Sequence, residues 1–248
     1  MAWHNTDPSN GASVAADAPG GLPALVRHYL ERALPAGGVL PGQIRITQTG
    51  EMWREPGARA MRFRAVQHFA VDRVGFRWEA RFPIAPLIAL KVTDGFADGN
   101  GLLRVQAFGL PLQRYAGHDV DVGEASRYLS ELVWVPAAIA ANPQLEWRAV
   151  DARRVEVATC VDGERVALAL DFDASGAIVA CSASARPRTV KGRSVPTPWG
   201  GEVTDYRVLG GIWMPTRAEV YWDLPEGRFV YWRGQITGAE ALQEPFGP

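Results

Sequence analysis

Cysteine, lysine and long apolar runs are scarce in this chain of 248 residues. The two cysteines, Cys160 and Cys181, fall on predicted strands that are next-but-one neighbours. Because adjacent strands lie ~4.8 Å apart, two buried thiols so placed are too far apart for a disulfide, and free thiols are typical of a reducing compartment. No run approaches the ~18 apolar residues of a membrane-spanning helix, and residues 1–21 lack the basic-then-apolar pattern of a secretory signal. The sequence therefore predicts a cytoplasmic protein that is not an integral membrane protein.

The charge balance and the missing motifs exclude further classes of function. The net charge is −1, whereas a nucleic-acid partner requires a strong basic excess. No CxxC, HExxH, GxSxG or Walker motif is present, and no complete GxGxxG follows a strand. The four histidines are scattered, and Asp94, Asp98 and Asn100 lack the closing Glu of a calcium loop, so a hairpin turn is favoured there. We predict no metal, no cofactor and no catalytic residue.

The length fits one domain, which we place at residues 22–238. Residues 1–21 are rich in Ala, Gly, Asp and Ser and are predicted to be a disordered tail. Residues 239–248 are predicted as a C-terminal tail. No internal repeat or break in composition divides the segment between them.

Alternation of apolar and polar residues dominates this domain. It is clearest where Phe76, Trp78, Ala80 and Phe82 alternate with charged residues. About eleven such runs at short spacing predict a mainly β fold, in which an antiparallel meander closes into a sandwich or barrel. The predicted strands are Gln43–Trp53, Met61–Val71, Phe76–Phe82, Leu87–Val92, Leu102–Phe108, Arg154–Val161, Arg165–Phe172, Ala177–Ala185, Val203–Leu209, Thr216–Asp223 and Phe229–Ile236.

Two segments have the periodicity of amphipathic helices. Leu22–Leu34 carries one apolar stripe, and Asp121–Ala141 repeats apolar residues at i, i+4 and i+7. In the second segment Asp121 is the predicted N-cap, and Glu124 completes a capping box. Pro136 removes a backbone donor, so we expect it to break this helix and leave a short helical turn after it.

One polar pair on the longer helix has two interpretations. Arg127 and Glu131 are spaced i, i+4. They form either a surface ion pair worth ~0.3–0.5 kcal/mol or a pair that points into a cavity under the helix and orients the head group of a ligand.

The nine tryptophans are the most unusual part of the composition. Trp and Tyr combine a large apolar body with one polar tip and so suit the walls of apolar ligand sites, although the hydrophobic core is the alternative for most of them. The run 186–193 carries four basic residues and is predicted as a solvated loop, with an anion or lipid head group as the alternative contact. The candidate ligand-binding aromatic residues are Trp134, Trp199, Tyr206, Trp213 and Trp222.

Several of these residues also occur in a pattern that resembles a bacterial family known as a domain of unknown function. The pattern is carried by the RYLSELVWVP run at 127–136, Trp147, the FDxxGxI turn at 172–178, PWGG at 198–201, and the series Gly210, Pro215, Glu219 and Trp222. The order of helix, strands, helix and strands is similar to that of the lipoprotein-sorting carriers. That resemblance implies a half-open antiparallel barrel with an N-terminal helix and a central helix pair over its concave face.

Three functions are compatible with these observations. The first is a soluble protein that binds a lipid or another apolar small molecule between the sheet and the central helices. The second is an enzyme that acts on an apolar substrate and uses Glu131 and Arg127. The third is a scaffold without a ligand, which predicts a filled core and an exposed apolar patch on Thr216–Ile236.

Overall fold

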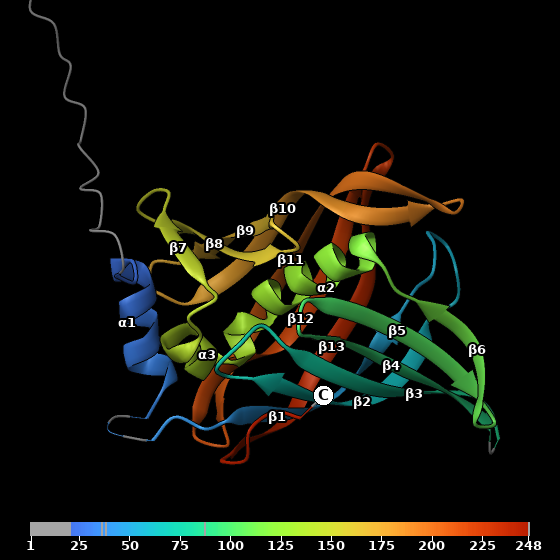
Figure 1. Ribbon diagram of the computed structural model, residues 1–248, viewed down its shortest axis with the longest axis horizontal. Helices are drawn as coiled ribbons and strands as arrows, with labels where there is room; N and C mark the ends of the chain where they lie inside the picture. The colour runs from blue at the N-terminus through green and yellow to red at the C-terminus, as the bar shows by residue number, and fades with distance from the viewer. Residues whose placement is uncertain (1–20, 36, 38, 87, 248) are drawn as a thin grey trace, which may run out of the picture.

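The computed structural model describes residues 21–35, 37, 39–86 and 88–247, and over these it is built around one curved sheet (Figure 1). The helices are α1 (Ala24–Ala33), α2 (His118–Glu131), the 3₁₀ turn η1 (Leu132–Trp134) and α3 (Pro136–Ala141). The strands are β1 (Gln43–Met52), β2 (Met61–Ala70), β3 (Phe76–Ala85), β4 (Ile88–Ala97), β5 (Asn100–Ala107), β6 (Leu110–Tyr115), β7 (Glu146–Ala149), β8 (Arg154–Val161), β9 (Glu164–Phe172), β10 (Ile178–Val190), β11 (Arg193–Leu209), β12 (Ile212–Leu224) and β13 (Gly227–Leu242).

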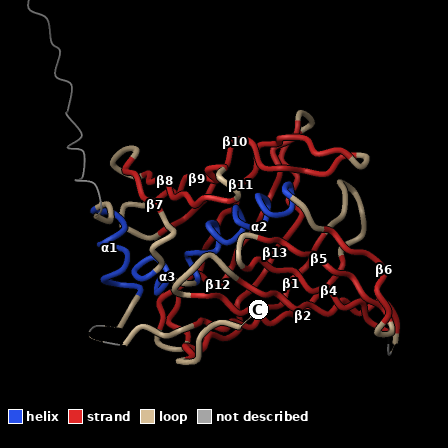
Figure 2. Tube along the Cα trace, in the orientation of Figure 1, coloured by secondary structure: helices blue, strands red, loops and turns tan. Residues whose placement is uncertain are grey.

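The strands form a single antiparallel sheet with the order β6-β5-β4-β3-β2-β1-β13-β12-β11-β10-β9-β8-β7. The first six strands and the last seven are each a meander, and the pairing of β1 with β13 joins the two meanders. The sheet therefore stays open, with β6 and β7 as its edges. Because α2, η1 and α3 connect these two edges in the chain, they cross the concave face, as Figures 1 and 2 show. The predicted half-open barrel with helices over its concave face is confirmed.

The structure has two more strands than the sequence predicted. The six residues of β6 are all exposed and include Pro111, which has no backbone N–H and weakens the strand pattern, and β7 is only four residues long. The run 186–193 is also not a loop. It forms the end of the β10–β11 hairpin, whose turn places Lys191 and Gly192 at positive φ. A polar, solvated hairpin end resembles a loop in sequence because neither face has to be apolar.

The helices agree with the predicted segments except at one cap. Pro136 is the first residue of α3, and it separates α3 from α2 as expected. The N-cap of α2 is Gly117, not Asp121. Asp121 lies inside the helix, where its Oδ1 accepts a hydrogen bond of 2.6 Å from the backbone N–H of Gly101 in β5. The carboxylate thus holds α2 to the sheet instead of capping it.

Tyrosine hydroxyls fix the helices within the concave face. Tyr29 of α1 donates a hydrogen bond of 3.0 Å to the carbonyl oxygen of Val133. The Tyr128 hydroxyl of α2 lies 3.0 Å from the carbonyl oxygens of Ala70 and Arg73. Both tyrosine side chains are fully buried, so each hydroxyl needs such a partner.

The structure also bears on the predicted ends of the domain and on the cysteines. Residues 1–20 of the expected N-terminal tail lie outside the described residues. At the other end β13 continues to Leu242, and Phe246 is buried, so the ordered chain extends past residue 238.

Cys160 and Cys181 lie on β8 and β10 with β9 between them, as expected. Cys181 is buried, but Cys160 is exposed, because it lies on the outer side of β8.

Candidate functional site

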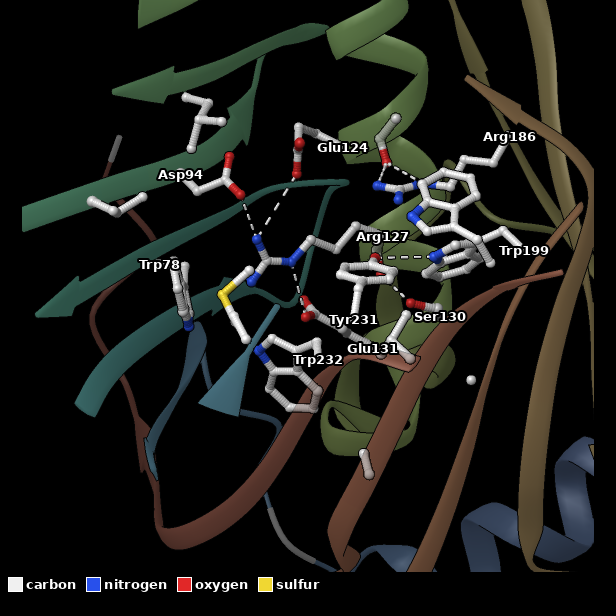
Figure 3. A pocket seen from close by; sticks show the side chains of 18 of the residues that line it. Trp78, Asp94, Glu124, Arg127, Ser130, Glu131, Arg186, Trp199, Tyr231 and Trp232 are labelled. Carbon is white, nitrogen blue, oxygen red and sulfur yellow. Dashed lines mark hydrogen bonds and ion pairs between the residues drawn. The ribbon is translucent and has the colours of Figure 1, made fainter. Parts of the chain in front are cut away.

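A cavity of about 680 Å³ lies between α2 and the concave face of the sheet. Residues of β1–β6, α2, η1 and β10–β13 line it, and Figure 3 shows it from close by. One part of the wall is apolar and comes from the first five strands: Met52, Met61, Phe82, Leu90, Val92 and Val105. Another part is aromatic: Trp78, Trp134, Trp199, Trp222, Tyr231 and Trp232.

Arg127 lies at the centre of a group of acidic side chains in this cavity (Figure 3). Its Nη1 is 2.6 Å from Oδ2 of Asp94 on β4, and its Nε is 3.0 Å from Oε1 of Glu131 one turn along α2. Oε2 of Glu124 is 4.0 Å from Nη1, too far for a hydrogen bond. The guanidinium also lies over the rings of Phe76 and Trp78, 4.7 and 5.2 Å from their centroids. These contacts fix the guanidinium with most of its surface out of solvent.

A chain of buried amides holds Glu131 from the side of the sheet. Trp78 donates from Nε1 to Oε1 of Gln48 at 3.2 Å, and Gln48 donates to Gln67 at 2.7 Å. Gln67 in turn donates from Nε2 to Oε2 of Glu131 at 2.7 Å. Gln48 and Gln67 are both fully buried. Each amide in this chain is satisfied only when its neighbours keep their orientation, so the chain fixes the carboxylate of Glu131.

The three carboxyl groups are not all neutralised. Asp94 Oδ1 and Glu124 Oε2 are buried and have no hydrogen-bond partner among the described residues. The pKa of Glu124 is raised to about 8, chiefly by burial and then by the negative charge of Asp94, while Arg127 and Arg186 act in the opposite direction. Burial likewise raises the pKa of Asp94 and of Glu131, again against the effect of Arg127. Burial of a carboxylate favours the neutral acid, so the cavity holds a proton near neutral pH.

Arg186 closes the aromatic side of the cavity. It lies on β10, within the run that the sequence predicted as a solvated loop. Its guanidinium donates to the carbonyl oxygen of Gly123, at 2.8 Å from Nη2, and lies 4.6 Å from the ring centroid of Trp199. Trp199 donates from Nε1 to the hydroxyl of Tyr231 at 3.0 Å. Arg186 therefore joins β10 to α2, and it forms no ion pair with a carboxylate among the described residues.

The structure places the seven predicted site residues in two groups. Arg127, Glu131, Trp134, Trp199 and Trp222 line the cavity, and the Arg127–Glu131 pair points into it instead of lying on the surface. Tyr206 and Trp213 lie elsewhere. Their rings are 4.2 Å apart, and Trp213 packs against Tyr29 and Arg32 of α1.

The sequence analysis missed Asp94, Glu124, Trp78 and Trp232 as cavity residues. Glu124 could have been found, because it precedes Arg127 by three residues and Glu131 by seven and so shares their helix face. Asp94 was assigned to a turn from its glycine-rich neighbours. It lies in β4 instead, paired in register with Trp78 of β3, and β4 and β5 form the expected hairpin with a shorter turn.

Comparison with known proteins places the chain in a family. A family model matches residues 12–234. The chain belongs to the family of unknown function DUF6544. This confirms the resemblance read from the sequence. No curated protein matches this DUF6544 chain, and none of its described helices has both the length and the apolar character needed to cross a membrane.

Among solved structures, this DUF6544 chain is similar to two bacterial proteins. A LolA superfamily protein from Nitrosomonas europaea matches with a TM-score of 0.49 and 11% identity, over 89% of this chain and 93% of that one. A DUF1329 family protein from Desulfovibrio piger matches with a TM-score of 0.47 and 11% identity, over 81% and 86%. Likeness at this level does not define a function.

Proposed function

We propose that the protein binds a lipid or another apolar small molecule in the cavity between α2 and the sheet. The observation that supports this proposal is the cavity itself. Its volume of about 680 Å³ lies within the ~300–1,000 Å³ of known small-molecule sites. Its wall also has the expected composition, which is mostly apolar and aromatic with a few polar groups held in fixed positions.

The scaffold hypothesis does not agree with this geometry. It required a filled core and an exposed apolar patch on Thr216–Ile236. The structure has a cavity there, and no large hydrophobic side chain in that segment, all of which is described, is among the exposed ones.

Uptake of a neutral apolar fluorophore tests the proposal. N-phenyl-1-naphthylamine becomes fluorescent in apolar sites, so a saturable increase at one molecule per chain is expected. Val92→Trp fills the cavity from β4 and is expected to abolish the signal. Thr93→Trp is the matched control, because the next residue of the strand points to the other face. Equal uptake by the two variants, or none by the wild type, contradicts the proposal.

An enzyme acting on an apolar substrate is the second candidate. One observation favours it, namely that the Glu131 carboxyl lies inside the cavity with a raised pKa, as a general acid or base requires. The test is the chemical composition of molecules extracted from the wild type and from Glu131→Gln after expression. An enzyme yields different compounds in the two extracts, whereas a binding protein yields the same compounds.

A further inference from the structure

Acidic groups outnumber basic ones in the polar part of the cavity. Asp94, Glu124 and Glu131 share one guanidinium, that of Arg127, so the group keeps two negative charges when every carboxyl is ionised. Arg186, which hydrogen-bonds to a backbone carbonyl, Arg54, Asp119 and Glu219 also line the cavity. Five acids therefore face three arginines, and one net negative charge remains even when Glu124 holds its proton. Arginine is the only basic residue type among the described residues that line the cavity.

One oxygen in each of two of these carboxyl groups also lacks a hydrogen-bond donor. Asp94 is only 8% exposed, yet its Oδ1 accepts no hydrogen bond within the described chain. Oε2 of Glu124 is also buried and also accepts no hydrogen bond from the described residues. Leaving a buried charged acceptor unpaired is costly. Figure 3 shows both side chains pointing from β4 and α2 toward the space around Arg127. A ligand that brings both a positive charge and N–H donors would satisfy these two oxygens.

The apolar wall begins directly beside this acidic group. Leu90 and Val92 lie on the same face of β4 as Asp94, because side chains two residues apart in a strand point to one side. At ~3.3 Å per residue the stripe from Asp94 to Leu90 is ~13 Å long. Met61 and Phe82 continue the apolar wall on β2 and β3. The arrangement matches a molecule with one polar end and one alkyl chain.

We propose that the cavity selects amphiphiles with a cationic, hydrogen-bond-donating head group, of which a primary alkylammonium is the simplest. The head group binds Asp94 and Glu124, and the alkyl chain lies along Val92 and Leu90. This inference rests on the proposed function of the cavity as an apolar binding site and adds the charge of the ligand.

Three probes with the same chain test the choice of head group. Decylammonium, decanol and decanoate are titrated calorimetrically into the full chain at pH 7. Decylammonium is expected to bind at least tenfold more tightly than the other two. Val92→Trp is expected to abolish the binding of all three, which separates the cavity from attraction to the protein surface.

Isosteric amide variants test the two carboxyl groups. Glu124→Gln and Asp94→Asn are each expected to weaken decylammonium binding about tenfold and to leave decanol binding unchanged. Glu226→Gln makes the same change in net charge at the exposed β12–β13 turn and is expected to change neither affinity.

Proton release gives a readout independent of affinity. The groups facing Glu124 are Asp94 on β4, Arg127 and Glu131 on α2, and Arg186 on β10. With a pKa of about 8, Glu124 is protonated in most free molecules at pH 7. An incoming cation favours the carboxylate, so binding should release about one proton. Calorimetry in buffers of different ionisation enthalpy measures this release, and Glu124→Gln should release none.

The outcomes separate the two proposals. If decanol or decanoate binds as tightly as decylammonium, or if Glu124→Gln leaves decylammonium binding unchanged, the cationic head group is wrong and the apolar site stands. If none of the three probes binds to the wild type, the proposed function itself is wrong.

Discussion

Arg127 forms ion pairs with Asp94 and Glu131 and lies 4.0 Å from Glu124. Its side chain is 18% exposed, and those of the three acids are 11 or 12% exposed. An ion pair this deeply buried costs desolvation energy on both sides, so its formation adds little net stability. Removing only the cation has a large effect, because it leaves the anions buried without a partner.

Replacing Arg127 should therefore destabilise the protein strongly. At pH 8, Arg127→Leu is expected to lower the free energy of unfolding by about 3–5 kcal/mol. Arg62→Leu is the control, since the Arg62–Glu51 pair has its arginine 86% exposed and should change stability by less than ~1 kcal/mol. Urea unfolding measures both variants. Similar losses in the two would contradict the account of the buried group.

Glu124 should make stability depend on pH. Its pKa is about 8 in the folded chain and about 4.3 in an unfolded chain, so the folded state binds the extra proton between these values. The contribution of Glu124 to the free energy of unfolding is therefore fully present below pH ~4 and is lost as the pH rises through ~8.

Glu124→Gln isolates this contribution, because the amide does not titrate. The wild type should lose stability relative to Glu124→Gln as the pH rises from 4.5 to 8.5, measured by urea unfolding at each pH. A constant difference between the two proteins over this range would show that Glu124 has an ordinary pKa.

At the scale of elements, α2 depends on close contact with β5. A Cβ atom at Gly101 would lie 2.9 Å from the carbonyl oxygen of Val120, which is a backbone atom and cannot move alone. Gly123 lies in α2 itself. A Cβ atom there would meet nothing nearer than Arg186 Nη2 at 3.8 Å. The two glycines therefore have different reasons to be present.

The same substitution should have opposite effects at these positions. Gly101→Ala is expected to destabilise the protein by about 1–3 kcal/mol, because it pushes α2 away from the sheet. Gly123→Ala is expected to stabilise it by about 0.5–1 kcal/mol, because alanine loses less backbone freedom in a helix than glycine does. Thermal unfolding of both variants measures the difference. A loss at Gly123 as large as at Gly101 would contradict the predicted packing.

The sequence predicted the elements better than their positions around the cavity. The spacing of Arg127 and Glu131 was sufficient to place them on one face of α2, because helical periodicity is local, and Trp134 follows in η1. Trp213 and Trp222 looked equivalent in sequence, but nine residues of β12 separate them by ~30 Å. One packs under α1 and the other lines the cavity. Which end of a long strand meets which helix depends on the sheet topology, which no local pattern contains.

At the scale of the whole molecule, the cavity follows from the connectivity of the sheet. The helical segment links edge strands β6 and β7, so it must cross the concave face of an open thirteen-stranded sheet. One short helix pair does not fill a concavity of this size, and about 680 Å³ remains between α2 and the strands. The central claim is that this space receives an apolar molecule.

Native mass spectrometry after incubation with one equivalent of the neutral lipid 1-decanoylglycerol tests that claim most directly. The account predicts a single 1:1 adduct in the wild type and in Thr93→Trp, and a bare chain in Val92→Trp. A bare chain in the wild type, or the same adduct in Val92→Trp, would contradict it.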